Sequence, residues 1–210
     1  MSLSNLIAKK LLEIKAIKLS PQSPFTWASG WQSPIYCDNR LTLSYPEIRA
    51  IIKDGLKELS MEFAPADVIV GVATAGIAHG LLLAEALELP FAYVRSKAKA
   101  HGRQNQIEGH IPPGAKTLVV EDLISTGGSL IKAVEAVRDN GAEVLGALAI
   151  FTYGFPQSVE NLSTAKVPFR TLSNYEVLLN EAMNLSYIAA SDKDTLNQWR
   201  LSPEHWKPIS

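Results

Sequence analysis

The sequence has 210 residues, 47% of them hydrophobic and 20% charged, which is an ordinary globular composition with enough apolar residues for one full core. Its net charge of −1 gives no general field to attract nucleic acid or an anionic membrane, and its one cysteine, Cys37, excludes a disulfide framework within the chain and a cysteine-based metal site. Since neither a signal peptide nor a membrane-spanning apolar stretch is evident, we expect a soluble, cytoplasmic protein with no nucleic-acid and no membrane partner.

The first quarter of the chain predicts two helices with an irregular segment between them. Apolar residues recur at helical spacing over residues 3–17. Ser44 and Glu47 have the spacing of a capping box, which predicts a second helix with its apolar face over residues 48–59. Because no linker, repeat or low-complexity tract follows, we expect one domain over residues 1–210.

The middle of the chain alternates between predicted strands and helices. Short runs rich in apolar residues predict strands at 68–72, 91–94, 117–120 and 144–151. Helices are expected at 78–87, at 129–140 with Gly141 closing it, and behind a cap formed by Ser173 and Glu176. This alternation predicts an α/β fold with a central parallel sheet flanked by helices. Ligands bind at the carboxyl ends of strands in such sheets, so the segments that follow strands are the candidate sites.

The most informative segment follows the strand at 117–120 and leads into a helix. It consists of Glu121, Asp122, Leu123, Ile124, Ser125, Thr126, Gly127, Gly128 and Ser129. Two adjacent carboxylates only accept hydrogen bonds, so they suit the vicinal hydroxyls of a sugar. The hydroxyl side chains, the backbone N–H groups that glycine leaves accessible and the N-terminus of the next helix suit a phosphate. A solvated acidic turn would explain the acid pair alone but not the whole segment.

Two common nucleotide-binding patterns do not occur in the sequence. Gly71 and Gly76 have the separation of a Walker A motif, but Ile77 stands where that motif needs lysine, and there is no G-x-G-x-x-G. A nucleotide triphosphatase and a Rossmann dehydrogenase are therefore disfavoured. The turn 71–76 has two interpretations: its backbone amides contact an anion, or its small residues allow tight packing of the helix on the strand.

The strand, the acid pair and the Ser/Thr/Gly loop before a helix resemble the signature of the type I phosphoribosyltransferases. The resemblance implies the fold of that family and a phosphoribosyl diphosphate site over residues 121–129. It implies that Glu121 and Asp122 hold the ribose 2′- and 3′-hydroxyls, that residues 123–129 bind the 5′-phosphate, and that the turn 71–76 contacts the diphosphate.

A basic segment follows the strand at 91–94. It contains Arg95, Lys97, Lys99, His101 and Arg103. A solvated charged loop is the ordinary explanation. However, the segment leaves the same predicted sheet edge as the acid pair, and a diphosphate needs cationic neutralisation.

The spacing of Arg95, Lys99 and His101-Gly102 is similar to that of a mobile loop of the orotate phosphoribosyltransferases. The resemblance implies that Arg95, Lys99 and His101 contact the diphosphate and that Lys99 matters most for the rate. It also implies that the loop closes over the active site of the other subunit of a homodimer. Many members have a second lysine directly after the arginine, where this chain has Ser96, and whether Lys97 compensates is open.

An aromatic and polar segment at residues 25–40 provides a second match to this family. The phrase Phe-Thr-x-x-Ser-Gly-x-x-Ser-Pro, which begins at Phe25, is similar to its N-terminal hood. The resemblance implies that residues 1–45 form a hood over the base site and that Ser125 touches orotate. The aromatic side chains suit stacking on a planar base or capping of a small core. Many relatives have a lysine where Ala28 lies and an arginine after the strand at 144–151; without these, Arg40 is a candidate counter-charge for the orotate carboxylate.

The resemblance predicts transfer of ribose 5-phosphate from phosphoribosyl diphosphate to orotate. We expect Mg²⁺ to be held through the substrate diphosphate and water, with no dedicated protein metal site. Positive charge develops on the sugar as its C1′–O bond breaks, so no protein nucleophile is required, and Lys99, His101 and Asp122 are the expected catalytic residues. The alternatives are a phosphoribosyltransferase for another nucleobase and a non-catalytic regulator that senses the sugar diphosphate; the regulator is disfavoured because no basic DNA-binding segment is evident.

Overall fold

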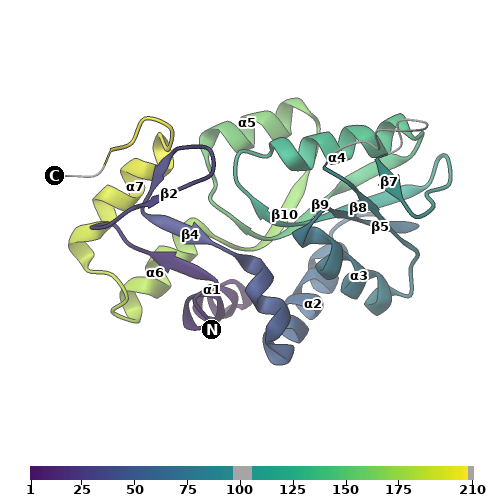
Figure 1. Ribbon diagram of the computed structural model, residues 1–210. Coiled ribbons are helices and arrows are strands. Elements are labelled where there is room, and N and C mark those ends of the chain that lie inside the picture. The colour runs from purple at the N-terminus through teal and green to yellow at the C-terminus, as the bar shows by residue number, and fades with distance from the viewer. Residues whose placement is uncertain (97–105, 208–210) are drawn as a thin grey trace.

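The computed structural model describes residues 1–96 and 106–207, and a twisted sheet lies at the centre of the molecule (Figure 1). Within these residues the sheet has six strands in the order β10-β9-β8-β5-β6-β7. Their bounds are Val68–Val72 (β5), Phe91–Val94 (β6), Ile107–Glu108 (β7), Lys116–Ile124 (β8), Glu143–Thr152 (β9) and Phe169–Asn174 (β10). Neighbouring strands run parallel, except that β7 is antiparallel to β6. The predicted α/β fold with a central parallel sheet is confirmed.

Both faces of the sheet are covered by helices, which explains why its strands are apolar on both sides. Alternate residues of β8 enter different cores: Leu118 and Val120 pack in one, Val119 in the other. The first core lies under α1 (Leu3–Glu13), α2 (Pro46–Ser60) and α3 (Ala75–Leu87), and the second under α4 (Gly128–Asp139) and α5 (Pro156–Thr164). Figure 1 shows these two helical layers below and above the sheet.

The N-terminal and C-terminal segments meet at one end of the molecule, beside β10 (Figure 1). The N-terminal part forms two small antiparallel pairs, β1 (Ile17–Leu19) with β4 (Ile35–Cys37) and β2 (Phe25–Thr26) with β3 (Gln32–Ser33). A 3₁₀ helix, η1 (Asn39–Ser44), then leads into α2. The C-terminal part consists of α6 (Tyr175–Asn184), a short 3₁₀ helix, η2 (Ala190–Asp192), and α7 (Lys193–Leu201), whose Trp199 is fully buried.

Several predicted boundaries are wrong for local reasons. The first helix ends at Glu13 rather than near residue 17, because Ile17 pairs with Cys37 in the small sheet. The capping box at Ser44 does not form: Ser44 ends η1, and α2 begins at Pro46 without a side-chain cap. Ser173 belongs to β10, and the cap of α6 is Asn174, whose side chain accepts a hydrogen bond from the N–H of Val177.

The other predicted elements are confirmed with shifts of a few residues. Strands β5 and β6 have the predicted bounds, while β8 and β9 are longer than predicted. Gly141 follows α4 with a φ of 85°, in the left-handed conformation expected of a residue that closes a helix. No helix in the described part of the chain combines the length and the apolar character that crossing a membrane requires.

Candidate functional site

The predicted site residues that the structure describes lie along the carboxyl edge of the sheet, where three cavities adjoin. The central cavity, of about 460 Å³, is lined by Cys37, Asp38, Arg40, Ala73, Thr74, Ala75, Glu121, Asp122, Leu123, Ser125 and Ser129. A loop-side cavity of about 220 Å³ shares Ala73 and Ser129 with it, and a hood-side cavity of about 250 Å³ shares Cys37, Leu123 and Ser125. The central cavity therefore adjoins each of the other two and lies between them.

The acid pair lies at the end of β8 and faces the central cavity. Glu121 is only 6% exposed, and its Oε1 accepts a hydrogen bond of 3.0 Å from the N–H of Asp122. The Ser129 hydroxyl lies 3.5 Å from Glu121 Oε2. Burial raises the pKa of both carboxyls, and the neighbouring Asp122 raises that of Glu121 further. No ion pair joins either acid to a described cation, so the pair retains acceptor capacity for hydroxyl donors.

Asn39 holds the acid pair from the opposite wall, a role that sequence reasoning missed. Asn39 is fully buried, and its Nδ2 donates a 2.8 Å hydrogen bond to the carbonyl oxygen of Asp122. Its own Oδ1 accepts from the Cys37 thiol at 3.3 Å. Because Asn39 lies 83 residues from Asp122 in sequence, no local signal could have identified the contact.

The loop behind the acids is tied back through its carbonyl groups. The Thr152 hydroxyl donates to the carbonyl of Ile124 at 3.1 Å, and Asn161 Nδ2 donates to that of Thr126 at 3.1 Å. Gly127 has a φ of 84° and precedes α4, whose first-turn N–H groups have no partner within the helix. These N–H groups are available to an anion, and the sequence-based prediction that they bind a phosphate stays a prediction. The side chain of Ile124 is buried in the core, so only its backbone can serve the site.

The turn between β5 and α3 confirms the packing interpretation of its small residues, while its contact with an anion stays a prediction. A Cβ added at Gly76 would collide with the carbonyl oxygen of Val120, so this glycine allows the helix to pack tightly against β8. Ala73, Thr74 and Ala75 meanwhile line the central cavity opposite the acids. The residue that packs and the residues that line the cavity are therefore different members of the same turn.

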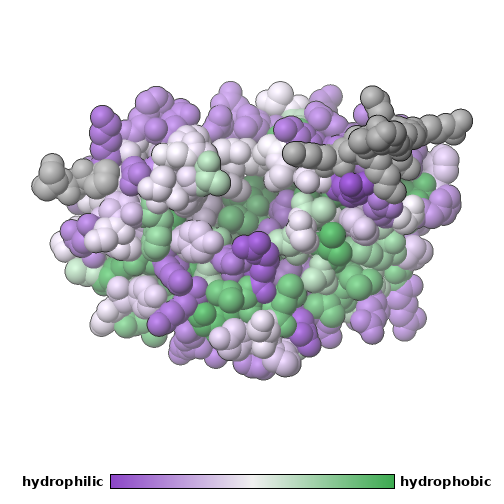
Figure 2. All heavy atoms as spheres, viewed as in Figure 1, coloured by the Kyte–Doolittle hydropathy of each residue, from purple (hydrophilic) through white to green (hydrophobic). Residues whose placement is uncertain are grey.

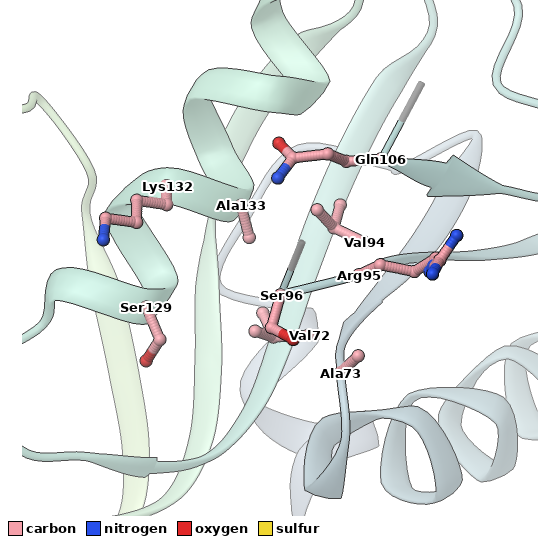
Figure 3. A pocket seen from close by; sticks show the side chains of 9 residues that line it. All are labelled: Val72, Ala73, Val94, Arg95, Ser96, Gln106, Ser129, Lys132 and Ala133. Atoms are coloured by element: carbon pink, nitrogen blue, oxygen red, sulfur yellow. The ribbon is translucent and has the colours of Figure 1, made fainter. Parts of the chain in front are cut away.

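The loop-side cavity lies between the end of β6 and the start of α4. It is lined by Val72, Ala73, Val94, Arg95, Ser96, Gln106, Ser129, Lys132 and Ala133 (Figure 3). Arg95 turns away from Ser129 toward β7, where its Nη1 lies 3.4 Å from Glu108 Oε1. Lys132, which the sequence interpretation did not single out, adds a cation to the lining. The predicted contacts of Lys97, Lys99, His101, Gly102 and Arg103 lie outside the described residues.

The hood-side cavity is walled by aromatic side chains and small hydroxyl groups. Its lining is Thr26, Trp27, Ala28, Tyr36, Cys37, Leu123, Ser125 and Tyr153. Trp27 is fixed by a 3.0 Å hydrogen bond from its Nε1 to the carbonyl of Ile35, and its ring lies 5.4 Å from that of Tyr153. The side chain of Arg40 is 63% exposed and pairs with Asp38 at 2.7 Å, and it lines the central cavity rather than this one. Tyr153 is a further lining residue that sequence reasoning missed.

Known proteins that are similar to this chain in sequence and in structure include phosphoribosyltransferases. The model of the phosphoribosyl transferase domain matches residues 43–167. The chain is 56% identical over 207 residues to an orotate phosphoribosyltransferase of Bacteroides fragilis, covering 98% of each chain. It is 57% identical over 206 residues to that of Bacteroides thetaiotaomicron, covering 98% of this chain and 97% of the relative. The crystal structure of orotate phosphoribosyltransferase from Aeropyrum pernix, 30% identical, matches with a TM-score of 0.76 over 87% of this chain and 99% of the other.

Proposed function

The chain belongs to the orotate phosphoribosyltransferase family of pyrimidine biosynthesis, and we propose that its three cavities divide the substrates between them. The reaction transfers the ribose 5-phosphate group of 5-phospho-α-D-ribose 1-diphosphate to orotate and yields orotidine 5′-monophosphate and diphosphate. In this proposal the central cavity takes the ribose, the loop-side cavity the diphosphate and the hood-side cavity the base. The observation that carries it is that the cavity lined by the acid pair shares wall residues with the loop-side cavity (Ala73, Ser129) and with the hood-side cavity (Cys37, Leu123, Ser125).

The acid pair and the following loop are assigned to the sugar phosphate. Glu121 and Asp122 accept hydrogen bonds from the ribose hydroxyls, and the 5′-phosphate binds against the start of α4. The residues assigned to the donor along this loop are Leu123, Ile124, Ser125, Thr126, Gly127, Gly128 and Ser129. Ser125 also lines the hood-side cavity, which supports its assignment to orotate.

Cations are assigned to the diphosphate. Arg95 lines the loop-side cavity, and Ser96 and Gln106, which border residues 97–105, line it as well. This placement supports the assignment of Lys99 and His101 to the departing diphosphate, with Lys99 contributing most to the rate. We keep the homodimer as part of the proposal, with Arg95, Lys99 and His101 shared between subunits. An apolar face is consistent with it: hydrophobic residues gather over the region of α2 and α3 (Figure 2), and Leu41 and Leu81 are exposed.

Catalysis in this proposal depends on position and charge. As the bond between C1′ and the diphosphate oxygen breaks, positive charge develops on the sugar ring. Asp122, held by Asn39 through its backbone, keeps its carboxylate beside that ring. The electron pair of the broken bond goes to the diphosphate oxygen, whose negative charge Lys99 and His101 stabilise. Orotate N1 then bonds to C1′ and releases its proton to a diphosphate oxygen or to water, and no covalent enzyme intermediate forms.

The residues present fit Mg²⁺ held mainly by the substrate. Oxygen ligands suit this ion, and Asp38, Glu121 and Asp122 all line the central cavity. No group of three or more His, Cys, Asp or Glu that could hold a metal occurs in the described part of the chain. Diphosphate oxygens and water would supply its ligands, and the acid pair keeps its assignment to the ribose hydroxyls. The ion would neutralise charge on the departing diphosphate.

The remaining expectations stay part of the proposal. We propose that residues 1–210 act as a single domain with residues 1–45 as its hood. One core, which contains Ile17, Ile35, Leu118 and Trp199, supports this unit because it draws on the hood, the sheet and α7. A cytoplasmic protein without nucleic-acid or membrane partners remains a prediction.

The proposal is tested by incubating the protein with the sugar diphosphate, Mg²⁺ and orotate and following the loss of orotate absorbance. Activity with orotate, and its absence with adenine, guanine, hypoxanthine or uracil, is the expected result. Lys99→Ala should lower kcat by about 10²–10³-fold, the range seen when one charge-stabilising donor is removed. An unchanged kcat in that variant would remove Lys99 from the mechanism, and turnover of another base in preference to orotate would contradict the substrate assignment.

A further inference from the structure

The hood-side cavity contains no charged side chain among the described residues that line it. Orotate is an anion, and moving its carboxylate from water into such a cavity is unfavourable unless hydrogen-bond donors meet it. The Cys37 thiol already donates to Asn39 at 3.3 Å, whereas the Thr26 hydroxyl accepts from Gln32 Nε2 at 2.8 Å and keeps its own O–H free. The side-chain donors of the lining are therefore the hydroxyl groups of Thr26, Tyr36, Ser125 and Tyr153, of which Thr26 and Tyr36 are exposed to water.

Tyr153 is the most rigidly placed of these groups. It follows β9, is 2% exposed and lines the hood-side cavity. Its ring centroid lies 5.4 Å from that of Trp27, 5.2 Å from that of Phe155 and 5.5 Å from that of Trp199. Packing on several sides fixes the ring, so its hydroxyl is held in place before any substrate arrives.

The hydroxyl of Tyr153 makes no hydrogen bond to the described part of the chain. Among the described residues, the side-chain polar atoms that are fully enclosed and lack a hydrogen bond are His79 Nδ1, Trp199 Nε1 and Arg200 Nε. The Tyr153 hydroxyl is not one of them, so it is not fully enclosed by protein. An unbonded hydroxyl that is not enclosed by protein must border open space, and the space that Tyr153 lines is the hood-side cavity.

Tyr175 provides the contrast within the same aromatic cluster. Its ring centroid also lies 5.6 Å from that of Trp199, but its hydroxyl donates a 3.0 Å hydrogen bond to the carbonyl of Leu196 and does not line the cavity. Burial raises the pKa of both phenols, so each remains protonated and able to donate at neutral pH. Of the two hydroxyls, that of Tyr153 is left for a ligand.

We propose that the Tyr153 hydroxyl donates a hydrogen bond to the orotate carboxylate and is a specificity-determining residue for the acceptor base. Ser125, which lines both the hood-side and central cavities, would donate from the ribose side. A neutral donor in a cavity without cations recognises the carboxylate by a charge-assisted hydrogen bond, which is stronger than a bond to a neutral oxygen. This inference rests on the proposed placement of the base in the hood-side cavity.

The test compares the binding of orotidine 5′-monophosphate and uridine 5′-monophosphate, which differ only by the carboxylate. Both Kd values are measured by calorimetry for the wild type and for Tyr153→Phe, which keeps the ring and removes the hydroxyl. We expect the variant to bind orotidine 5′-monophosphate about 10-fold more weakly, as for loss of a hydrogen bond to a charged group, with little change for uridine 5′-monophosphate. In turnover, KM for orotate should rise while kcat changes by less than about 3-fold.

Tyr175→Phe is the matched control, because it removes a hydroxyl from the same cluster without altering the cavity. It should lower the thermal stability and leave the ratio of the two Kd values unchanged. An unchanged ratio in Tyr153→Phe, or equal weakening of both nucleotides, would overturn the assignment to the carboxylate while leaving the proposed function intact. A wild-type protein that binds neither nucleotide would overturn both.

Discussion

The acid loop (residues 120–129) borders the central cavity, and the aromatic cluster (Trp27, Tyr153, Phe155, Tyr175 and Trp199) reaches the adjoining hood-side cavity through Trp27 and Tyr153, but the two regions are built in opposite ways. The acid loop is one continuous stretch of chain, so its carboxyl groups, hydroxyl groups and glycines are neighbours in the sequence as well as in space. The aromatic cluster unites three distant segments around Trp199 through ring contacts of 5.2–5.6 Å. The polar groups assigned to the sugar phosphate are therefore concentrated in the acid loop, while the shape of the hood-side cavity depends on tertiary packing.

The largest effect on stability is expected from Trp199→Ala. Removing a fully buried indole from the aromatic cluster should lower the free energy of unfolding by about 3–5 kcal/mol and the Tm by roughly 10 °C. Because the acid loop is built locally, Kd for phosphoribosyl diphosphate should change by less than about 3-fold in the folded variant while KM for orotate rises. Thermal unfolding measures the loss of stability, and calorimetric titration measures Kd for phosphoribosyl diphosphate. An equal loss of sugar affinity would mean that the two regions are not separable.

Asp122→Asn should produce the reverse pattern. The amide cannot accept as two negatively charged oxygens do, so affinity for phosphoribosyl diphosphate should fall by about 10-fold or more. Asp38→Asn is the control, since Asp38 lines the same cavity but is paired with Arg40 at 2.7 Å. Calorimetric Kd values decide the matter, and unimpaired donor affinity in Asp122→Asn would argue against its contact with the ribose hydroxyls.

Asn39→Ala probes how far the acid loop depends on the rest of the fold. The variant leaves the carbonyl of Asp122 without its 2.8 Å donor, which should lower the free energy of unfolding by about 1–3 kcal/mol. It should also weaken binding of the sugar diphosphate. Asn161→Ala removes a comparable bond to Thr126 from a half-buried position and should have the milder effect on stability. Chemical denaturation of both variants measures the loss in the free energy of unfolding. An equal loss in the two variants would contradict a larger contribution from Asn39.

Glu121→Gln is expected to have the smallest effect on stability, and one that depends on pH. Burial raises the pKa of Glu121 above its ordinary value of 4.5, so above that pH the folded state holds a proton that the unfolded state releases. The wild type therefore loses stability as pH rises from 4.5 through the raised pKa, and the variant avoids this loss. Its Tm should exceed that of the wild type by a few degrees at pH 8 and by less at pH 5. Glu135→Gln, at an exposed position of α4, is the control, and a Tm difference that is the same at both pH values would contradict the account.

The sequence predicted the elements that depend on neighbouring residues and missed the roles that depend on contacts between distant segments. Strand β8, its acids and the start of α4 were predicted because apolar periodicity and glycine act over a few residues. The capping box at Ser44 was wrong because α2 begins at Pro46, one residue later than that pattern requires. Strand β10 lacks an apolar run and owes its place to pairing with β9. Asn39 and Tyr153 carry no local signal, because the groups that give them a role lie elsewhere in the chain.

The most direct measurement is a crystal structure of the protein with phosphoribosyl diphosphate and Mg²⁺. The account predicts the 5′-phosphate against residues 125–129, the ribose hydroxyls within hydrogen-bond distance of Glu121 and Asp122, and the diphosphate in the loop-side cavity. A sugar bound elsewhere, with the acid loop in contact only with water, would contradict it.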